Sequence, residues 1–94
     1  MRFNDLKFQP LLDGVQSIVN YDESGYELSI VRHSGSYGGK NGLYEIGVFF
    51  NGAMQELDGV TAPDDTVKGY LTEEEVNAIL LKMIALTGYE GKQV

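Results

Sequence analysis

Two runs in which apolar and polar residues alternate, 26–33 and 43–50, constrain the fold of this chain more than any other feature. In the first run Leu28 and Ile30 lie on one side, and in the second Ile46 and Val48 do, as in strands that bury one face of a sheet. The glycine-rich segment 34–42, SGSYGGKNG, joins the two runs. The sequence therefore predicts two strands connected by a glycine-rich loop.

Turn residues predict further strands on both sides of this pair. Gly25 ends a polar turn and can adopt a positive φ, so the run before it should return as a hairpin. Asn51-Gly52 is the strongest short signal for a two-residue type I′ turn. Pro10 lacks a backbone donor and restricts the residue before it, which favours an extended segment over a helix. The predicted strands lie near residues 6–9, 15–21, 26–33, 43–50 and 53–57.

A single helix is predicted over residues 73–86. Thr72 is followed three residues later by Glu75, which is the pattern of a capping box, and Gly88 is suited to end the helix. Between them the apolar residues recur at helical spacing, as Val76, Ile79, Leu80, Met83 and Ile84. The apolar sheet face is the only surface large enough to cover this stripe. We expect residues 89–94 to be a frayed tail.

The predicted fold is therefore α+β, a four-stranded mainly antiparallel β-meander packed on one face by a single C-terminal α-helix. The four strands of the meander are 15–21, 26–33, 43–50 and 53–57, and the short segment near 6–9 is an extended or edge segment beside them. The length of 94 residues suits one domain over residues 1–94. The chain has no cysteine, which excludes disulfides and thiolate metal sites and suits a reducing compartment. It has neither a signal segment at its start nor an apolar run of about 18 residues. We expect a cytoplasmic protein that does not bind membranes.

The residues needed for several chemistries are missing. Between Gly35 and Gly39 stand three residues where a phosphate-binding loop has four, Asn41 replaces the Ser or Thr that binds magnesium, and a strand follows where that motif has a helix. His33 is the only histidine, and no G-x-S-x-G motif is present. We therefore predict no catalytic residues, no metal site, no cofactor and no enzymatic activity. The net charge of −7 also argues against direct binding to duplex nucleic acid.

The 34–42 loop is the first candidate contact surface. No acidic residue occurs between Leu28 and Tyr44, which makes this window locally positive in an acidic protein. An aromatic residue near the centre of such a loop can anchor a partner, and glycines allow close backbone approach. The candidate contacts for a partner or an anion are Arg32, His33, Tyr37, Gly38, Gly39 and Lys40. The alternative is a mobile loop whose glycines only accommodate the turn.

A second candidate surface is acidic. Its members are Asp64, Asp65, Glu73, Glu74 and Glu75. Such a face can imitate the phosphates of a nucleic acid and bind the basic groove of an enzyme. The alternative is that the three glutamates only stabilise the start of the helix.

Four motifs carry a resemblance to a known group of proteins. They are GYELSIV at residues 25–31, SYGG at 36–39, GLYEIGV at 42–48 and GYLTEEEV at 69–76. In this order they resemble the strand, loop, strand and helix start of small uncharacterised proteins encoded by tailed phages and prophages. The resemblance implies a phage origin, and it brings no catalytic residue or cofactor with it.

The predicted function is that of a non-enzymatic phage or prophage accessory protein, which binds a macromolecule of the host or the phage. A protein partner that contacts the 34–42 loop is the leading interpretation. Two alternatives remain open at this point. The chain could bind a small anion or other small ligand through the same loop, or it could be a minor structural component.

Overall fold

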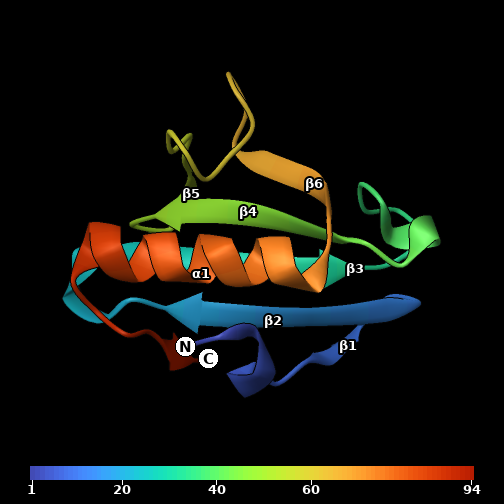
Figure 1. Ribbon diagram of the computed structural model, residues 1–94, viewed down its shortest axis with the longest axis horizontal. Coiled ribbons are helices and arrows are strands. Elements are labelled where there is room, and N and C mark those ends of the chain that lie inside the picture. The colour runs from blue at the N-terminus through green and yellow to red at the C-terminus, as the bar shows by residue number, and fades with distance from the viewer.

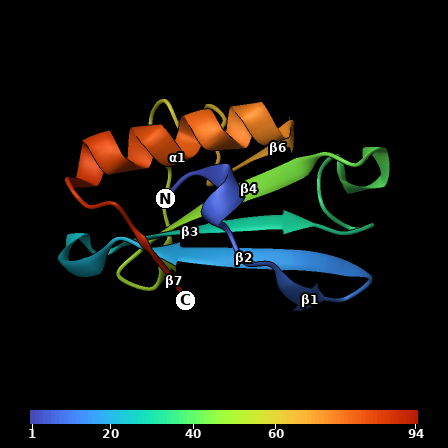
Figure 2. The ribbon, with the colours of Figure 1, turned by 60° about the horizontal axis from the view of Figure 1, so that its bottom comes forward.

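A seven-stranded antiparallel sheet carries one α-helix, α1 (Glu73–Thr87), across one face in the computed structural model, which describes residues 1–94 (Figures 1 and 2). The strands are β1 (Gln9–Leu11), β2 (Gly14–Asn20), β3 (Tyr26–Arg32), β4 (Tyr44–Phe50), β5 (Ala53–Met54), β6 (Val67–Leu71) and β7 (Lys92–Gln93). Three short 3-10 helices are η1 (Phe3–Asp5), η2 (Asp22–Ser24) and η3 (Gly39–Asn41). The α+β class is confirmed, but the prediction of four strands is too low.

The three long strands β2, β3 and β4 form the centre of the sheet, and the short strands complete its two edges. The order is β1-β2-β3-β4-β5, with β6 also paired to β4 and β7 also paired to β2. On one edge β5 pairs with the end of β4 at Phe49 and Phe50, whereas β6 pairs with its beginning. On the other edge β1 pairs with the beginning of β2, and β7 pairs with its end. Two short strands thus share each edge.

The hairpins lie where the turn residues predict them, with shifted ends. Asn51 and Gly52 both have positive φ, 50° and 86°, as a type I′ turn requires. β5 stops at Met54 and does not reach residue 57. The Val48 carbonyl of β4 accepts from the Gln55 amide, but the Val48 amide donates to the Thr66 carbonyl, just before β6. At Val48 the edge of β4 therefore passes from one partner segment to the other. The first strand lies at 9–11 and not near 6–9. Pro10 is tolerated there because β1 is a short edge strand.

Helix α1 begins at the predicted residue, ends one residue later than predicted, and buries the predicted face. Glu75 N donates to Thr72 Oγ1 at 3.2 Å, Thr72 N donates to Glu75 Oε1 at 3.0 Å, and Gly88 ends the helix with φ 78°. Four residues of its stripe are buried against the sheet, and the core on both sides of this interface includes Leu28, Ile30, Ile46, Val48, Val76, Ile79, Leu80 and Met83. Neither this helix nor the shorter ones are long and apolar enough to cross a membrane.

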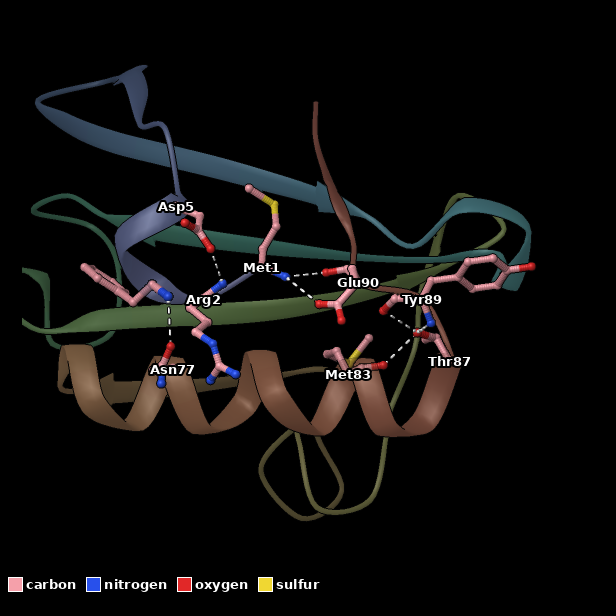
Figure 3. A network of polar contacts seen from close by, with 9 residues as sticks. Met1, Arg2, Asp5, Asn77, Met83, Thr87, Tyr89 and Glu90 are labelled. Atoms are coloured by element: carbon pink, nitrogen blue, oxygen red, sulfur yellow. Dashed lines mark hydrogen bonds and ion pairs between the residues drawn. The ribbon is translucent and has the colours of Figure 1, made fainter.

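The prediction of a frayed tail at residues 89–94 is wrong. Lys92 and Gln93 form β7 against β2, and the Gln93 side chain bonds to the buried Ser17 hydroxyl, with Nε2 donating at 2.9 Å. The amino terminus reaches the same region, where the Met1 ammonium donates to the Glu90 carbonyl and lies 3.6 Å from its carboxylate (Figure 3). Tertiary pairing therefore orders a tail that has no local signal of its own.

Candidate functional site

The 34–42 loop lies at one end of the sheet, between β3 and β4, and its backbone is folded into consecutive turns (Figure 1). Seven of its nine backbone amides donate hydrogen bonds within the protein. They are the amides of Ser34, Gly35, Ser36, Tyr37, Gly39, Asn41 and Gly42. Ser36 is buried, and its hydroxyl accepts from the His33 amide at 3.0 Å and donates to the His33 carbonyl at 2.8 Å. The loop is thus built by a dense local network.

Two carboxylates from outside the loop contact it. Asp13, in the turn between β1 and β2, accepts from Ser34 N at 3.0 Å, and Glu45 of β4 accepts from Tyr37 N at 2.9 Å. Hydrogen bonding from the side chain and the backbone amide of Ser34 lowers the pKa of Asp13 below its ordinary value. The acid-free window of the sequence is therefore not acid-free in space, because neighbouring segments supply two negative charges.

The glycines of the loop are required by close backbone packing. Gly38 has φ 91°, and a Cβ at Gly39 would lie 1.8 Å from the His33 carbonyl oxygen. On the facing strand, a Cβ at Gly69 would lie 2.3 Å from the Tyr37 Cβ. Gly38 and Gly39, both among the predicted contacts, are therefore needed for the backbone of the loop to pack closely against its neighbours.

Arg32 and His33 are occupied by neighbours within the protein. The Arg32 guanidinium lies 5.0 Å from the centre of the Tyr44 ring and donates from Nη1 to its hydroxyl at 3.2 Å. Burial raises the pKa of Tyr44, and the charge of Arg32 opposes that rise. His33 Nδ1 accepts from Gly35 N at 3.1 Å. Both predicted contacts thus have partners within the protein, and both also line a surface depression beside Asp13 and Lys40.

Tyr37 and Lys40 remain available at the surface, and the structure adds Tyr70 of β6 to them. The exposed fractions of Tyr37 and Tyr70 are 59% and 60%, and Tyr70 N donates to the Tyr37 carbonyl at 3.1 Å. Lys40 makes no hydrogen bond or ion pair through its side chain. These residues line one shallow surface depression, which we call the tyrosine hollow; its lining residues are Ser34, Ser36, Tyr37, Gly38, Lys40, Asn41 and Tyr70.

Tyr70 is the functional candidate that the sequence interpretation missed. Its backbone is left-handed, with φ 56°, although tyrosine carries a Cβ that disfavours this conformation. The pairing of β6 with β4 is irregular between Tyr44 and Ile46, close to this residue. A period-two pattern in VKGYL at 67–71 was the available signal for the strand. The contact with Tyr37 has no signal in the sequence, because it depends on that pairing.

The five acidic residues do not form one surface patch. Asp64 and Asp65 precede β6, and Glu73, Glu74 and Glu75 follow it. β6 has five residues, and at about 3.3 Å per residue it separates the two groups by roughly 16 Å. Asp65 accepts from the amides of the next two residues, and Glu75 accepts from the helix N-cap amide. Local backbone capping thus explains at least two of these acids.

The chain shows no arrangement suited to hold a metal ion, since no group of three or more His, Asp or Glu side chains gathers in it. Comparison of the chain with protein-family models, with characterised proteins and with solved structures finds no significant match. The function is therefore argued from the geometry of the tyrosine hollow.

Proposed function

We propose that this chain is a non-enzymatic accessory protein of a phage or prophage, and that it binds a protein of the host or the phage through the tyrosine hollow. Its place of action would be the cytoplasm of the bacterial host. One observation carries the proposal: two exposed tyrosines line the same depression, on backbone segments that are hydrogen-bonded to each other. The phage origin is supported by the four sequence motifs alone.

Exposed tyrosines on a hydrogen-bonded backbone favour a binding role because of their energetics. Tyrosine offers a large amphipathic contact surface with only two side-chain torsions to immobilise, and it is enriched among the residues that dominate interfaces. The remaining residues of the loop are mostly Ser, Gly and Asn, the composition of binding loops that adapt their hydrogen bonds to a partner. Because the loop backbone is already bonded, little of its freedom would be lost on association.

The same geometry does not favour the anion-binding alternative. A phosphate or sulfate is held by several backbone amides that point at one place. Here seven amides of the loop already donate within the protein, and two of their acceptors are the carboxylates of Asp13 and Glu45. These internal acceptors take the places that a bound anion would need. The loop donors that remain are the backbone amides of Gly38 and Lys40 and the Lys40 ammonium. Arg32, His33 and Lys40 also line a neighbouring depression, but the Asp13 carboxylate lies there too.

The proposal is tested by quantitative capture of host proteins on the immobilised chain. We expect wild-type protein to retain a partner in a fixed molar ratio, and Tyr37→Ala to reduce the retained amount at least tenfold. Leu86→Ala is the matched control, because Leu86 is 58% exposed on α1 and lies outside the hollow. Equal retention by Tyr37→Ala and wild type, with both folded by circular dichroism, would contradict the proposed surface.

A further inference from the structure

We propose that the partner contributes an extended, proline-containing segment, which lies in the tyrosine hollow with proline rings against Tyr37 and Tyr70. This inference rests on the proposed function and specifies the chemistry of the ligand. It follows from three properties of the hollow: its hydrogen-bonding groups, its aromatic walls and its size.

The free polar groups that line the hollow are suited to donate hydrogen bonds. The Tyr37 and Tyr70 hydroxyls, the Lys40 ammonium and the Asn41 side-chain amide have no partner within the protein. All four can donate, and the ammonium can only donate. No carboxylate lines the hollow. The two hydroxyls and the Asn41 amide can also accept, so donors outnumber acceptors here without excluding them. The hollow therefore suits a ligand that is rich in acceptors.

An extended proline-containing segment has this character. In the polyproline II conformation the backbone makes no internal hydrogen bonds, so its carbonyl groups need outside donors, and each proline lacks an N–H. Aromatic-lined grooves recognise such segments in several unrelated domains, because the preformed helix loses little entropy on binding. A sugar differs in that its hydroxyls also donate, and a hollow without carboxylates offers them fewer acceptors.

The size and the backbone of the hollow point the same way. Its volume of about 320 Å³ is at the small end of ligand sites and accommodates a few residues of an extended chain. Tyr70 keeps a left-handed backbone, with φ 56°, that Asn or Gly would adopt more readily. What tyrosine adds at position 70 is an exposed ring at the depression that Tyr37 also lines. A residue held in a disfavoured conformation at an exposed site supports a binding role.

The test is a titration of the ¹⁵N-labelled full chain with acetylated, amidated decaproline, followed by NMR. We expect saturable shifts confined to the amides of residues 34–42 and of Tyr70. Tyr37→Ala and Tyr70→Asn should each weaken binding at least tenfold, while Leu86→Ala leaves it unchanged. Since Asn accepts a left-handed backbone, Tyr70→Asn should stay folded while it replaces the aromatic ring by a small amide. A glycine-serine peptide of equal length should produce no saturable shifts.

Three results would overturn the inference: no saturable shifts with decaproline, equal binding of the glycine-serine peptide, or binding of maltohexaose at these residues in place of decaproline. The capture experiment separates this failure from that of the proposed function. If decaproline fails while Tyr37→Ala still loses the captured partner, the hollow binds a protein by another chemistry. If both experiments are negative, the hollow is not a binding surface.

Discussion

Tyr21 offers a sharp test of the packing of this domain. The side chain is fully buried, and its hydroxyl is the one buried side-chain polar atom without a hydrogen-bond partner. Gly91 closes over its ring, because a Cβ at that glycine would lie 3.0 Å from the ring edge. Burial raises the pKa of Tyr21 far above its ordinary value. We predict that Tyr21→Phe stabilises the protein, since it keeps the ring and removes the unpaired hydroxyl.

The expected gain follows from the cost of that hydroxyl. A buried hydrogen-bonding group without a partner destabilises the folded state by about 1–3 kcal/mol. Removing the oxygen relieves this cost, but the small gap that it leaves loses dispersion contacts, which offsets part of the gain. We expect the free energy of unfolding to rise by about 1–2 kcal/mol. In a domain of this size each kcal/mol corresponds to an increase in Tm of about 4–8 °C.

The substitution should also change how stability depends on pH. The raised pKa means that native Tyr21 keeps its proton at pH values where the unfolded chain, with a tyrosine pKa of about 10, loses it. The contribution of this group is therefore complete below about pH 10 and is lost as pH rises toward the native pKa. Between pH 9 and pH 11 the free energy of unfolding should therefore fall less in Tyr21→Phe than in wild type. The difference is the contribution of the Tyr21 hydroxyl.

Urea unfolding at pH 7 and at alkaline pH measures both effects. A rise in the transition midpoint with an unchanged slope reports a true gain in stability. Tyr37→Phe is the matched control, because its hydroxyl lies at the surface, and its effect should stay within about 0.5 kcal/mol. A loss of more than about 0.5 kcal/mol in Tyr21→Phe would refute the reasoning and would indicate a buried water bonded to the hydroxyl.

Three further predictions concern the core, the loop and the tail. Leu80→Ala should lower the free energy of unfolding, measured in urea, by about 2–5 kcal/mol, because Leu80 is fully buried. The same change at its exposed neighbour, Leu81→Ala, should lower it by less than about 1 kcal/mol. Similar losses for the two variants would mean that α1 packs through another face. The Asp13 carboxyl should titrate by NMR below the usual aspartate pKa of about 3.9. Its contribution to stability is therefore present above that pH and is lost as pH falls through the lower native pKa. A titration midpoint at or above about 3.9 would contradict the hydrogen bonds from Ser34. Gln93→Ala should speed amide exchange in β7, and unchanged exchange would show that its side-chain bonds do not hold the tail.

Features with a local physical cause could be predicted from the sequence. Thr72 and Glu75 cap the helix that their spacing predicts. Asn51 and Gly52 form the hairpin turn that their preference for positive φ predicts. The alternation that places Leu28 and Ile30 on one side of a strand also places them in the core. Each of these depends on residues only a few positions apart.

Features that depend on distant pairing could not be predicted in the same way. β7 consists of two residues whose order comes from β2, more than 70 positions earlier in the chain. The tyrosine hollow exists because β6 pairs with β4 and carries Tyr70 to Tyr37. The negative charges beside the loop come from Asp13 and Glu45, and only the three-dimensional register brings them there.

The contact between the two ends of the chain has a consequence for folding kinetics. Hydrogen bonds there join residues that are 74 to 89 positions apart, such as Phe3 with Asn77 and Met1 with Glu90. Closing a loop of that length costs more chain entropy than forming the hairpins of β2, β3 and β4, so we expect the ends to join after the hairpins have formed. The same step should be the first to reverse, and native-state opening would then begin by exposing Tyr21 beneath Gly91.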